Sequence, residues 1–244
     1  MKSRLIVSIS VALTLTVLSI NAQVFQKGDR TLEIEFVQEP PCPITIITKS
    51  VTLDPDPNTD KEHIMLQIEN RSNVGIRAYS MVSGGNRYPT VHTWIFTTAP
   101  LESGKTVQRG VWPNRQEHYY FFFDYILYAD GTVCGVNNHR RAIQIEGYLQ
   151  ARKSALSRLQ ELVVDPTLST RLIEELDSSA AGGFFSSDKA GPPNEETSKR
   201  MPQRAWEHVI AYLRSIKPRD KTITALADKL ETEIPRDGEE VKTN

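Results

Sequence analysis

Residues 119–128 read YYFFFDYILY, and this stretch decides the fold because it is apolar on nearly every position of both strand faces. A strand with one face in water alternates between apolar and polar residues, whereas a strand without alternation is covered on both faces. We therefore predict that one face lies in the core of a two-sheet structure and that a second layer covers the other face. The helix that follows is the candidate for this layer, with Tyr148, Leu149 and Leu156 as its contact residues.

Seven short strands, this one included, are predicted in the first two thirds of the chain. Asp130-Gly131 is the strongest hairpin signal, because a type I′ turn needs positive φ at both central residues. The predicted strands are Pro43–Leu53, His63–Glu69, Ile76–Met81, Val91–Thr97, Thr106–Trp112, His118–Tyr128 and Thr132–Val136. This spacing predicts a fold that is β-rich plus α, with an immunoglobulin-like antiparallel β-sandwich over residues 40–137. A small open barrel is the alternative.

The period of the apolar residues becomes helical from about Ala142. Asp165 and Pro166 predict the N-cap and the first position of a second helix. Residues 138–180 are therefore predicted to form helices that pack on the sandwich. The remaining predictions are a flexible linker at 181–200, a helical C-terminal segment at 201–234 and a disordered tail at 235–244.

The N-terminus has the pattern of a secretory signal peptide. Lys2 and Arg4 precede an uncharged run from Leu5 to Ile20, and the small residue Ala22 precedes Gln23. The sequence therefore predicts a signal peptide at residues 1–22, with an uncleaved membrane anchor as the alternative. Export to the periplasm or the medium follows, and no membrane span is expected after cleavage.

Composition limits the classes of partner. The 244 residues are 39% apolar and 24% charged, as in ordinary globular chains. Removing residues 1–22 takes away Lys2 and Arg4 and no acidic residue, which leaves 27 basic and 30 acidic residues, a net charge of −3. This charge gives no reason to expect a nucleic acid partner. The basic runs His139-Arg140-Arg141 and Lys199-Arg200 are interpreted as solvated helix ends.

Cys42 and Cys134 are the two cysteines of the chain. In an oxidising compartment two cysteines readily form a disulfide. The bridge would close a loop of about 90 residues, which the chain-entropy account values at about 4 kcal/mol. Two small buried thiols are the alternative, and the sequence leaves both open.

The hairpin residues also carry a resemblance. Residues 124–135, DYILYADGTVCG, resemble a strand–turn–strand signature of the form D-x-V-x-F-x-D-G-x-x-W-G in uncharacterised exported bacterial proteins. The stretches Ile68–Ser72 and Ala99–Gly104 are similar to upstream parts of the same proteins. Cys134 stands where the signature has Trp. The resemblance covers roughly residues 40–155 and implies a β-sandwich followed by a helix, with no catalytic residues.

The expected sandwich also suggests a route for the disulfide. In such sandwiches the first and last strands often run side by side and parallel. That arrangement would bring Cys42, at the start of the first predicted strand, near Cys134, at the start of the last.

The sequence contains few residue patterns that are typical of catalytic or metal-binding sites. Four oxygen-bearing side chains recur at every second residue, as at the start of a calcium loop, but Thr59 stands where that loop needs Gly and Met65 where it needs Glu. These weak calcium candidates are Asp54, Asp56, Asn58 and Asp60. A solvated loop is the better interpretation. No catalytic residue, metal ligand set or cofactor site is otherwise predicted.

Aromatic residues outside the central strand suggest two binding surfaces. Phe184-Phe185 lies in the predicted linker, where docking on the chain itself is favoured over docking on a partner. Tyr79, Tyr88, Trp94 and Trp112 would line a surface or, as is commoner, pack in the core.

The residues favour a non-catalytic exported protein that acts as an interaction or envelope-structural module. Its partner would be an unknown protein or envelope component. Two alternatives stay open: a hydrolase whose site is dispersed over the loops, and a calcium-dependent adhesion module.

Overall fold

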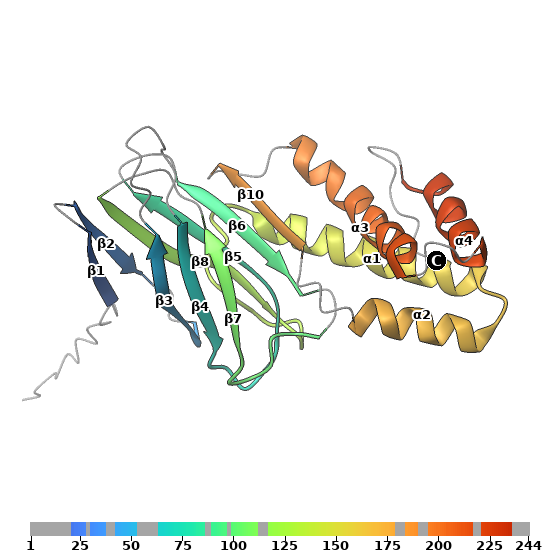
Figure 1. Cartoon of the computed structure of the whole chain (residues 1–244), viewed down its shortest axis with the longest axis horizontal. Helices are drawn as coiled ribbons and strands as arrows, with labels where there is room; N and C mark the ends of the chain where they lie inside the picture. The colour runs from blue at the N-terminus through green and yellow to red at the C-terminus, as the bar shows by residue number, and fades with distance from the viewer. Residues whose placement is uncertain are drawn as a thin grey trace, which may run out of the picture.

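The computed structural model describes residues 21–27, 30–37, 42–52, 63–85, 89–96, 99–111, 117–178, 184–189, 195–216 and 221–235. In this part of the chain two β-sheets form one end of an elongated molecule and the helices form the other (Figure 1). The prediction of a fold that is β-rich plus α is confirmed.

The seven predicted strands are all present, as β3 to β9, and three further strands join them. The strands are β1 (Asn21–Lys27), β2 (Arg30–Phe36), β3 (Ile44–Thr52), β4 (His63–Asn70), β5 (Ile76–Gly85), β6 (Thr90–Ile95), β7 (Thr106–Val111), β8 (His118–Tyr128), β9 (Val133–Cys134) and β10 (Phe184–Lys189). The helices are α1 (Arg141–Leu162), α2 (Pro166–Ser178), α3 (Glu195–Ile216) and α4 (Lys221–Thr232).

The strands form a large and a small sheet. The large sheet has the order β1-β2-β8-β5-β6-β10, and β9 also pairs with β8. The small sheet has the order β3-β4-β7. All pairs are antiparallel except β2 and β8, which run parallel. The large sheet is therefore built around β8, the strand with the longest apolar run.

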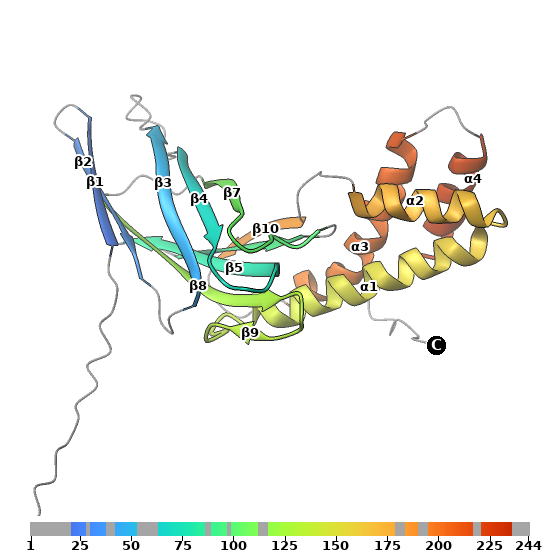
Figure 2. The ribbon, with the colours of Figure 1, turned by 90° about the horizontal axis from the view of Figure 1, so that it is seen from below.

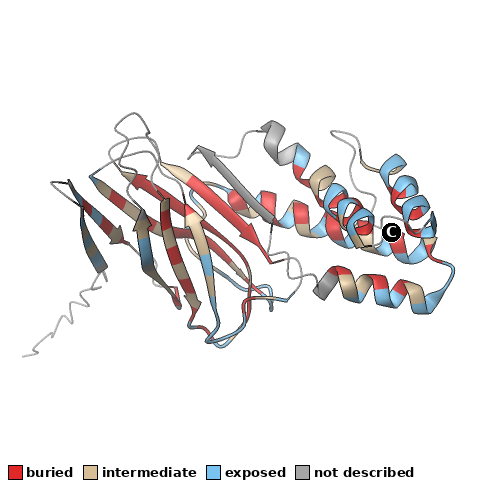
Figure 3. Ribbon diagram, in the orientation of Figure 1, coloured by how far each residue is buried: buried red, intermediate tan, exposed pale blue. Residues whose placement is uncertain are grey.

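One face of β8 lies in a core that both sheets share (Figure 3). Its residues in this core are Tyr119, Phe121, Phe123, Ile126 and Tyr128. The step from Phe123 to Ile126 departs from strict alternation because the register with β5 shifts at Asp124. A β-bulge of this kind inserts one residue and turns the strand, so both segments keep their large side chains in the core.

The other face of β8 is covered in part: Tyr120 and Phe122 are half-buried, whereas Tyr125 is buried. Tyr120 and Phe122 stack with their ring centroids 6.2 Å apart, and Phe122 lies 6.5 Å from the ring of His139. Tyr120 packs so closely on β5 that a Cβ at Gly84 would collide with its ring. A side chain at position 84 would therefore force the Tyr120 ring to move.

Helix α1 provides part of this cover. Tyr125 of β8 belongs to the same apolar cluster as Tyr148, and Leu149 and Leu156 pack against that cluster. Figure 2 shows that the first turns of α1 lie near the sheet and that the helix then extends away from it. A helix of 22 residues is about 33 Å long.

The rest of α1 packs with the other three helices in a helical unit, whose apolar cluster continues to Ala78, Ile95 and Tyr125 of the large sheet. Apolar residues of all four helices form its core, including Leu159, Leu176, Val209 and Leu226. Helix α2 begins as predicted, because Asp165 Oδ1 accepts hydrogen bonds from the backbone N–H groups of Thr167 and Leu168, at 2.9 and 3.4 Å. That helices of residues 138–180 pack on a sandwich stays a prediction; the contact seen is that of the helical cluster with Ala78, Ile95 and Tyr125.

Charged side chains attach α4 and the residue after it, Glu233, to two other helices. Arg158 of α1 donates to both carboxylate oxygens of Glu233, at 2.6 and 2.9 Å, and this contact lowers the pKa of Glu233. Arg214 of α3 donates to Asp228 and Glu231 of α4, at 3.0 and 2.7 Å. The short C-terminal helix is thus fixed by ion pairs as well as by its apolar face.

The flexible linker predicted at 181–200 needs a correction. Residues 184–189 form β10, which pairs antiparallel with β6 over six residue pairs, and α3 begins at Glu195. The edge of β6 has backbone donors and acceptors that need partners, and β10 provides them. Ser- and Gly-rich composition around residue 184 concealed this strand.

Candidate functional site

The signature hairpin and the two upstream stretches of the resemblance, Ile68–Ser72 and Ala99–Gly104, meet at one end of the sheets. Asn70, in the first part, donates its backbone N–H to Lys105 and accepts from Gly104 N–H, at 3.1 and 2.8 Å. Ile76 and Leu101 exchange two backbone hydrogen bonds. Ala129, next to the Asp-Gly turn, donates to the carbonyl of Gly75 at 2.8 Å. The resembling residues therefore hold three loops together.

The side chain of Asn70 is the centre of this arrangement. It is fully buried, and its Nδ2 donates to the carbonyls of Val74 and Leu101 at 2.8 and 2.7 Å. Its Oδ1 accepts from the backbone N–H and the hydroxyl of Ser72, at 2.9 and 2.7 Å. Both ends of the amide are used internally, so Asn70 acts as a structural link between loops.

The Asp-Gly hairpin is present, but it is not the predicted type I′ turn. Gly131 has φ +85°, whereas Asp130 is not at positive φ. Asp130 Oδ1 instead accepts from the backbone N–H and hydroxyl of Thr132, at 2.9 and 2.6 Å, and these bonds lower the pKa of Asp130. The loop is therefore stabilised by an Asx-type turn with glycine at the one left-handed position.

Asp124, the first residue of the signature, fixes the entry to α1. Its carboxylate is fully buried and accepts from the backbone N–H groups of Asn138 and His139, at 2.8 and 3.1 Å. Gly135 has φ +107° and lies against the backbone carbonyl of Asp124, where a Cβ would collide. These contacts explain both the Asp and the final Gly of the signature as structural residues.

The predicted disulfide between Cys42 and Cys134 is present, with the Cα atoms 6.0 Å apart. The predicted arrangement, in which the two cysteines lie on neighbouring parallel strands, is wrong, however. Cys134 belongs to β9 of the large sheet, whereas Cys42 precedes β3 of the small sheet. The bridge therefore joins the two sheets across their shared core and does not link parallel neighbours.

A serine and a histidine form a pair on β5 and β6. Ser83 Oγ lies 2.7 Å from His92 Nε2, and the imidazole stacks on Trp94 with ring centroids 5.6 Å apart. Such a pair forms part of a hydrolase triad when a substrate can reach it. Here Ser83 is 3% and His92 6% exposed, and burial lowers the pKa of His92 to about 4. The pair links two strands in the core.

Acid is expected to destabilise the protein through His92. Its pKa is about 4 in the folded protein and about 6.5 when unfolded, so the unfolded state binds more protons between these values. The neutral imidazole makes its full contribution to the free energy of unfolding above pH 6.5. As the pH falls towards 4 this contribution is lost, and the free energy of unfolding decreases by up to about 3 kcal/mol. Urea unfolding over this range would measure the loss.

The matched variants for this experiment are His92→Gln and His63→Gln. The first should remove this part of the pH dependence. The second changes a partly exposed histidine of β4 and should retain it. An equal slope of stability against pH in wild type and His92→Gln would contradict the assignment.

Of the four aromatic residues considered for a binding surface, two lie in the core and two lie outside the described residues. Tyr79 and Trp94 are buried and lie 5.0 Å apart between ring centroids, which confirms the core interpretation for these two. Burial raises the pKa of Tyr79. Tyr88 and Trp112 lie outside the described residues, and so do most of residues 1–22 and all four calcium candidates: Asp54, Asp56, Asn58 and Asp60.

The helical unit contains a tyrosine–histidine contact. The hydroxyl of Tyr148 lies 2.9 Å from His208 Nδ1, which joins α1 to α3. Burial raises the pKa of Tyr148 to about 12, and desolvation at this contact lowers the pKa of His208. Arg141, interpreted as part of a solvated helix end, is in fact buried and donates to Gln144 Oε1 at 3.0 Å.

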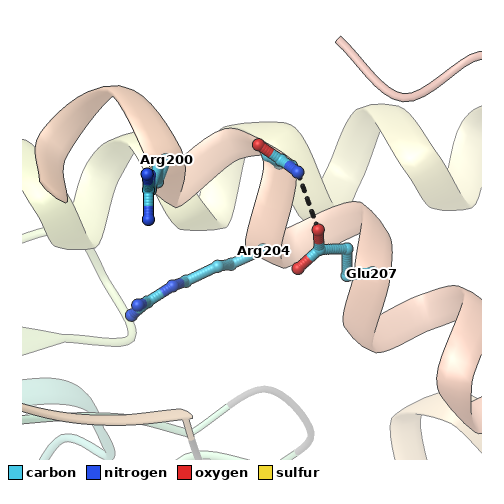
Figure 4. Close-up of a pocket in the computed structure, with 4 residues that line it drawn as sticks. Arg200, Arg204 and Glu207 are labelled. Atoms are coloured by element: carbon cyan, nitrogen blue, oxygen red, sulfur yellow. Dashed lines mark hydrogen bonds between the residues drawn. The ribbon is translucent and has the colours of Figure 1, made fainter. Parts of the chain in front are cut away.

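A polar groove of about 310 Å³ lies along α3. It is lined by Arg200, Gln203, Arg204 and Glu207. Figure 4 shows the two arginine side chains extending to one side of the helix, while Gln203 Nε2 donates to Glu207 Oε1 at 2.8 Å. Sequence reasoning missed this groove, although the spacing of Arg200 and Arg204 by one helical turn was a usable signal.

Within the described ranges, no three His, Cys, Asp or Glu side chains are placed so that they could hold a metal ion. None of the described helices is both long enough and apolar enough to cross a membrane. Comparison of the sequence and the fold with protein-family models, curated proteins and solved structures finds no match.

Proposed function

We propose that this protein is a non-catalytic, exported interaction module that binds an anionic segment of another protein or envelope component through the groove on α3. The groove carries the proposal because its side chains are two guanidinium groups and an amide bonded to a carboxylate. Arginine is the residue that most often recognises carboxylates in bidentate fashion.

The geometry of α3 suits this role. Arg200 and Arg204 are separated by one helical turn, so their side chains cover neighbouring parts of the same face. The carboxylate of Glu207 is held by Gln203 at 2.8 Å. The two guanidinium groups among the lining side chains favour acidic partners.

The two sheets and the loops that join them form a β unit, which would act as the rigid support of the helices. The inter-sheet disulfide and the buried bonds of Asn70 and Asp124 support this division of labour, because they stabilise the β unit without contributing to a binding surface. We also propose that the unit is an immunoglobulin-like sandwich. Export is supported by the pattern of residues 1–22 and by a disulfide, which persists in oxidising compartments.

Charge reversal on α3 tests the function. Arg204→Glu, alone and with Arg200→Glu, should reduce photo-crosslinking of the native exported protein to its partner by at least about ten-fold, because one attraction becomes a repulsion. In the wild type, mass spectrometry should place the crosslinks to the partner on α3. Lys153→Glu changes an exposed cation on α1 and is the matched control that should crosslink normally.

Two results would contradict this function. One is partner crosslinking that survives the double charge reversal. The other is turnover by the purified protein that is lost in Ser83→Ala, which would instead favour the hydrolase with a dispersed site.

A further inference from the structure

Helix α3 carries a row of basic side chains that continues beyond the arginines of the groove. Arg200, Arg204 and His208 follow one another at intervals of four residues, so each lies about one helical turn after the last. Figure 4 shows the two arginines of this row extending to one side of the helix. Arg200 and His208 are exposed, and Arg204 is partly exposed. His208 is therefore the next member of the row.

The imidazole of His208 is held in place by helix α1. The hydroxyl of the buried Tyr148 lies 2.9 Å from His208 Nδ1, and the two rings meet edge to face with their centroids 5.8 Å apart. A side chain that is already fixed loses less conformational entropy when it makes a further contact. The imidazole is thus pre-organised beside Glu207, one of the residues that line the groove.

We propose that His208 is a further binding residue of the α3 groove, and that it attracts the anionic partner only when its imidazole is protonated. This inference rests on the function proposed for α3, to which it adds a residue and a pH dependence. An acidic segment that follows the row would meet two arginines at neutral pH. In mildly acidic solution it would meet the two arginines and an imidazolium, so the complex should become tighter.

The groups around His208 come from both helices that meet at its imidazole. Desolvation beside Tyr148 is the largest cause of the lowered pKa of His208. The carboxylate of Glu207 raises this pKa, whereas the guanidinium groups of Arg152 on α1 and Arg204 on α3 lower it. An anion bound at Arg204 offsets the positive charge of that guanidinium. The pKa of His208 is therefore expected to be higher in the complex than in the free protein.

Proton linkage gives the sign of the effect on binding. Because the pKa of His208 is higher in the complex, binding takes up part of a proton at pH values between the pKa of the free protein and that of the complex. The affinity should be lowest well above the pKa of the complex, and it should rise as the pH falls. Below the pKa of the free protein it should stop changing. The whole gain should be about two- to five-fold, as for a partly exposed charge pair.

Calorimetric titration with an acetylated hexa-aspartate peptide tests the proposal, because the side chains of this peptide stay ionised between about pH 5.5 and pH 8. The wild-type exported protein should bind the peptide about two- to five-fold more tightly at the lower pH. His208→Gln keeps an acceptor for the Tyr148 hydroxyl and should bind equally at both pH values, as weakly as the wild type at the higher pH. His63→Gln, on β4, is the matched control and should keep the wild-type pH dependence.

NMR titration of the imidazole measures the coupling directly, with the His208 signal identified by its loss in His208→Gln. The pKa of His208 should rise in Arg204→Gln without any peptide, because a neighbouring cation is removed. In the wild type it should rise when the peptide is added. A His208 pKa that is the same in wild type and Arg204→Gln would overturn the inference.

The two proposals fail in different ways. Peptide binding that is lost in Arg204→Gln but is equal at both pH values would overturn the role of His208 and leave the function of the groove intact. Binding whose pH dependence persists in His208→Gln would assign that dependence to another group, and would also overturn the inference. A peptide that binds the wild type at neither pH would overturn both proposals.

Discussion

Replacing Cys42 and Cys134 together by serine is expected to lower the free energy of unfolding by about 4 to 5 kcal/mol. The two residues are 92 positions apart, so the bridge removes a large loop-closure entropy from the unfolded chain. It also joins the large sheet to the small one, so its loss acts on the core they share. Urea unfolding of the double variant and the oxidised wild type measures the difference.

Reduced wild-type protein is the control for this experiment, because it lacks the bridge but keeps both sulfur atoms. Its stability should fall by nearly the same amount as that of the double variant. A loss of less than about 1 kcal/mol in both would show that the unfolded chain is restricted by something other than the bridge.

The second large effect is expected at Asn70. Asn70→Ala removes four side-chain hydrogen bonds and leaves the buried carbonyls of Val74 and Leu101 without these donors. At roughly 1 kcal/mol for each bond, the expected loss of unfolding free energy is about 4 kcal/mol. Asn70→Asp should be at least as damaging, because a carboxylate would then face the two carbonyl oxygens instead of a donor.

The neighbouring residue Asn73 provides a control in the same loop. Its side chain is exposed, so Asn73→Ala should change the unfolding free energy by less than about 0.5 kcal/mol. Chemical denaturation of the three variants beside wild type gives all the values needed. If Asn70→Ala were as mild as Asn73→Ala, the three loops would be held together by their backbone hydrogen bonds alone.

Several features of the fold could be predicted from the sequence because they depend on residues that are close together in the chain. The seven strands β3 to β9 follow from apolar spacing and from the turns between them. Residues 30–36, RTLEIEF, carry the same period-two signal in Leu32, Ile34 and Phe36, so β2 could have been predicted as well. β10 could not, because FFSSDK has no alternation and becomes a strand only by pairing with β6.

Some features of the site residues could likewise be predicted from the sequence, and others could not. The pairing of the two cysteines was a sound hypothesis from their number and the predicted export, but their route across the sheets was not. Asp124 was visible as the first residue of the signature, but its role could not be predicted, since it depends on a β-bulge and on a loop fourteen residues further along the chain. The groove on α3 had a weak signal in two arginines one turn apart.

The sequence by itself determined the class of the fold, the positions of most strands and helices, and the need for cover on both faces of residues 119–128. These follow from side-chain period and turn chemistry, which act over a few residues. Tertiary structure alone decided the order of the strands, the parallel pairing of β2 with β8, and which edges stay open. Those outcomes depend on contacts between distant residues, because the backbone of an edge strand pairs with whichever segment the rest of the fold brings beside it.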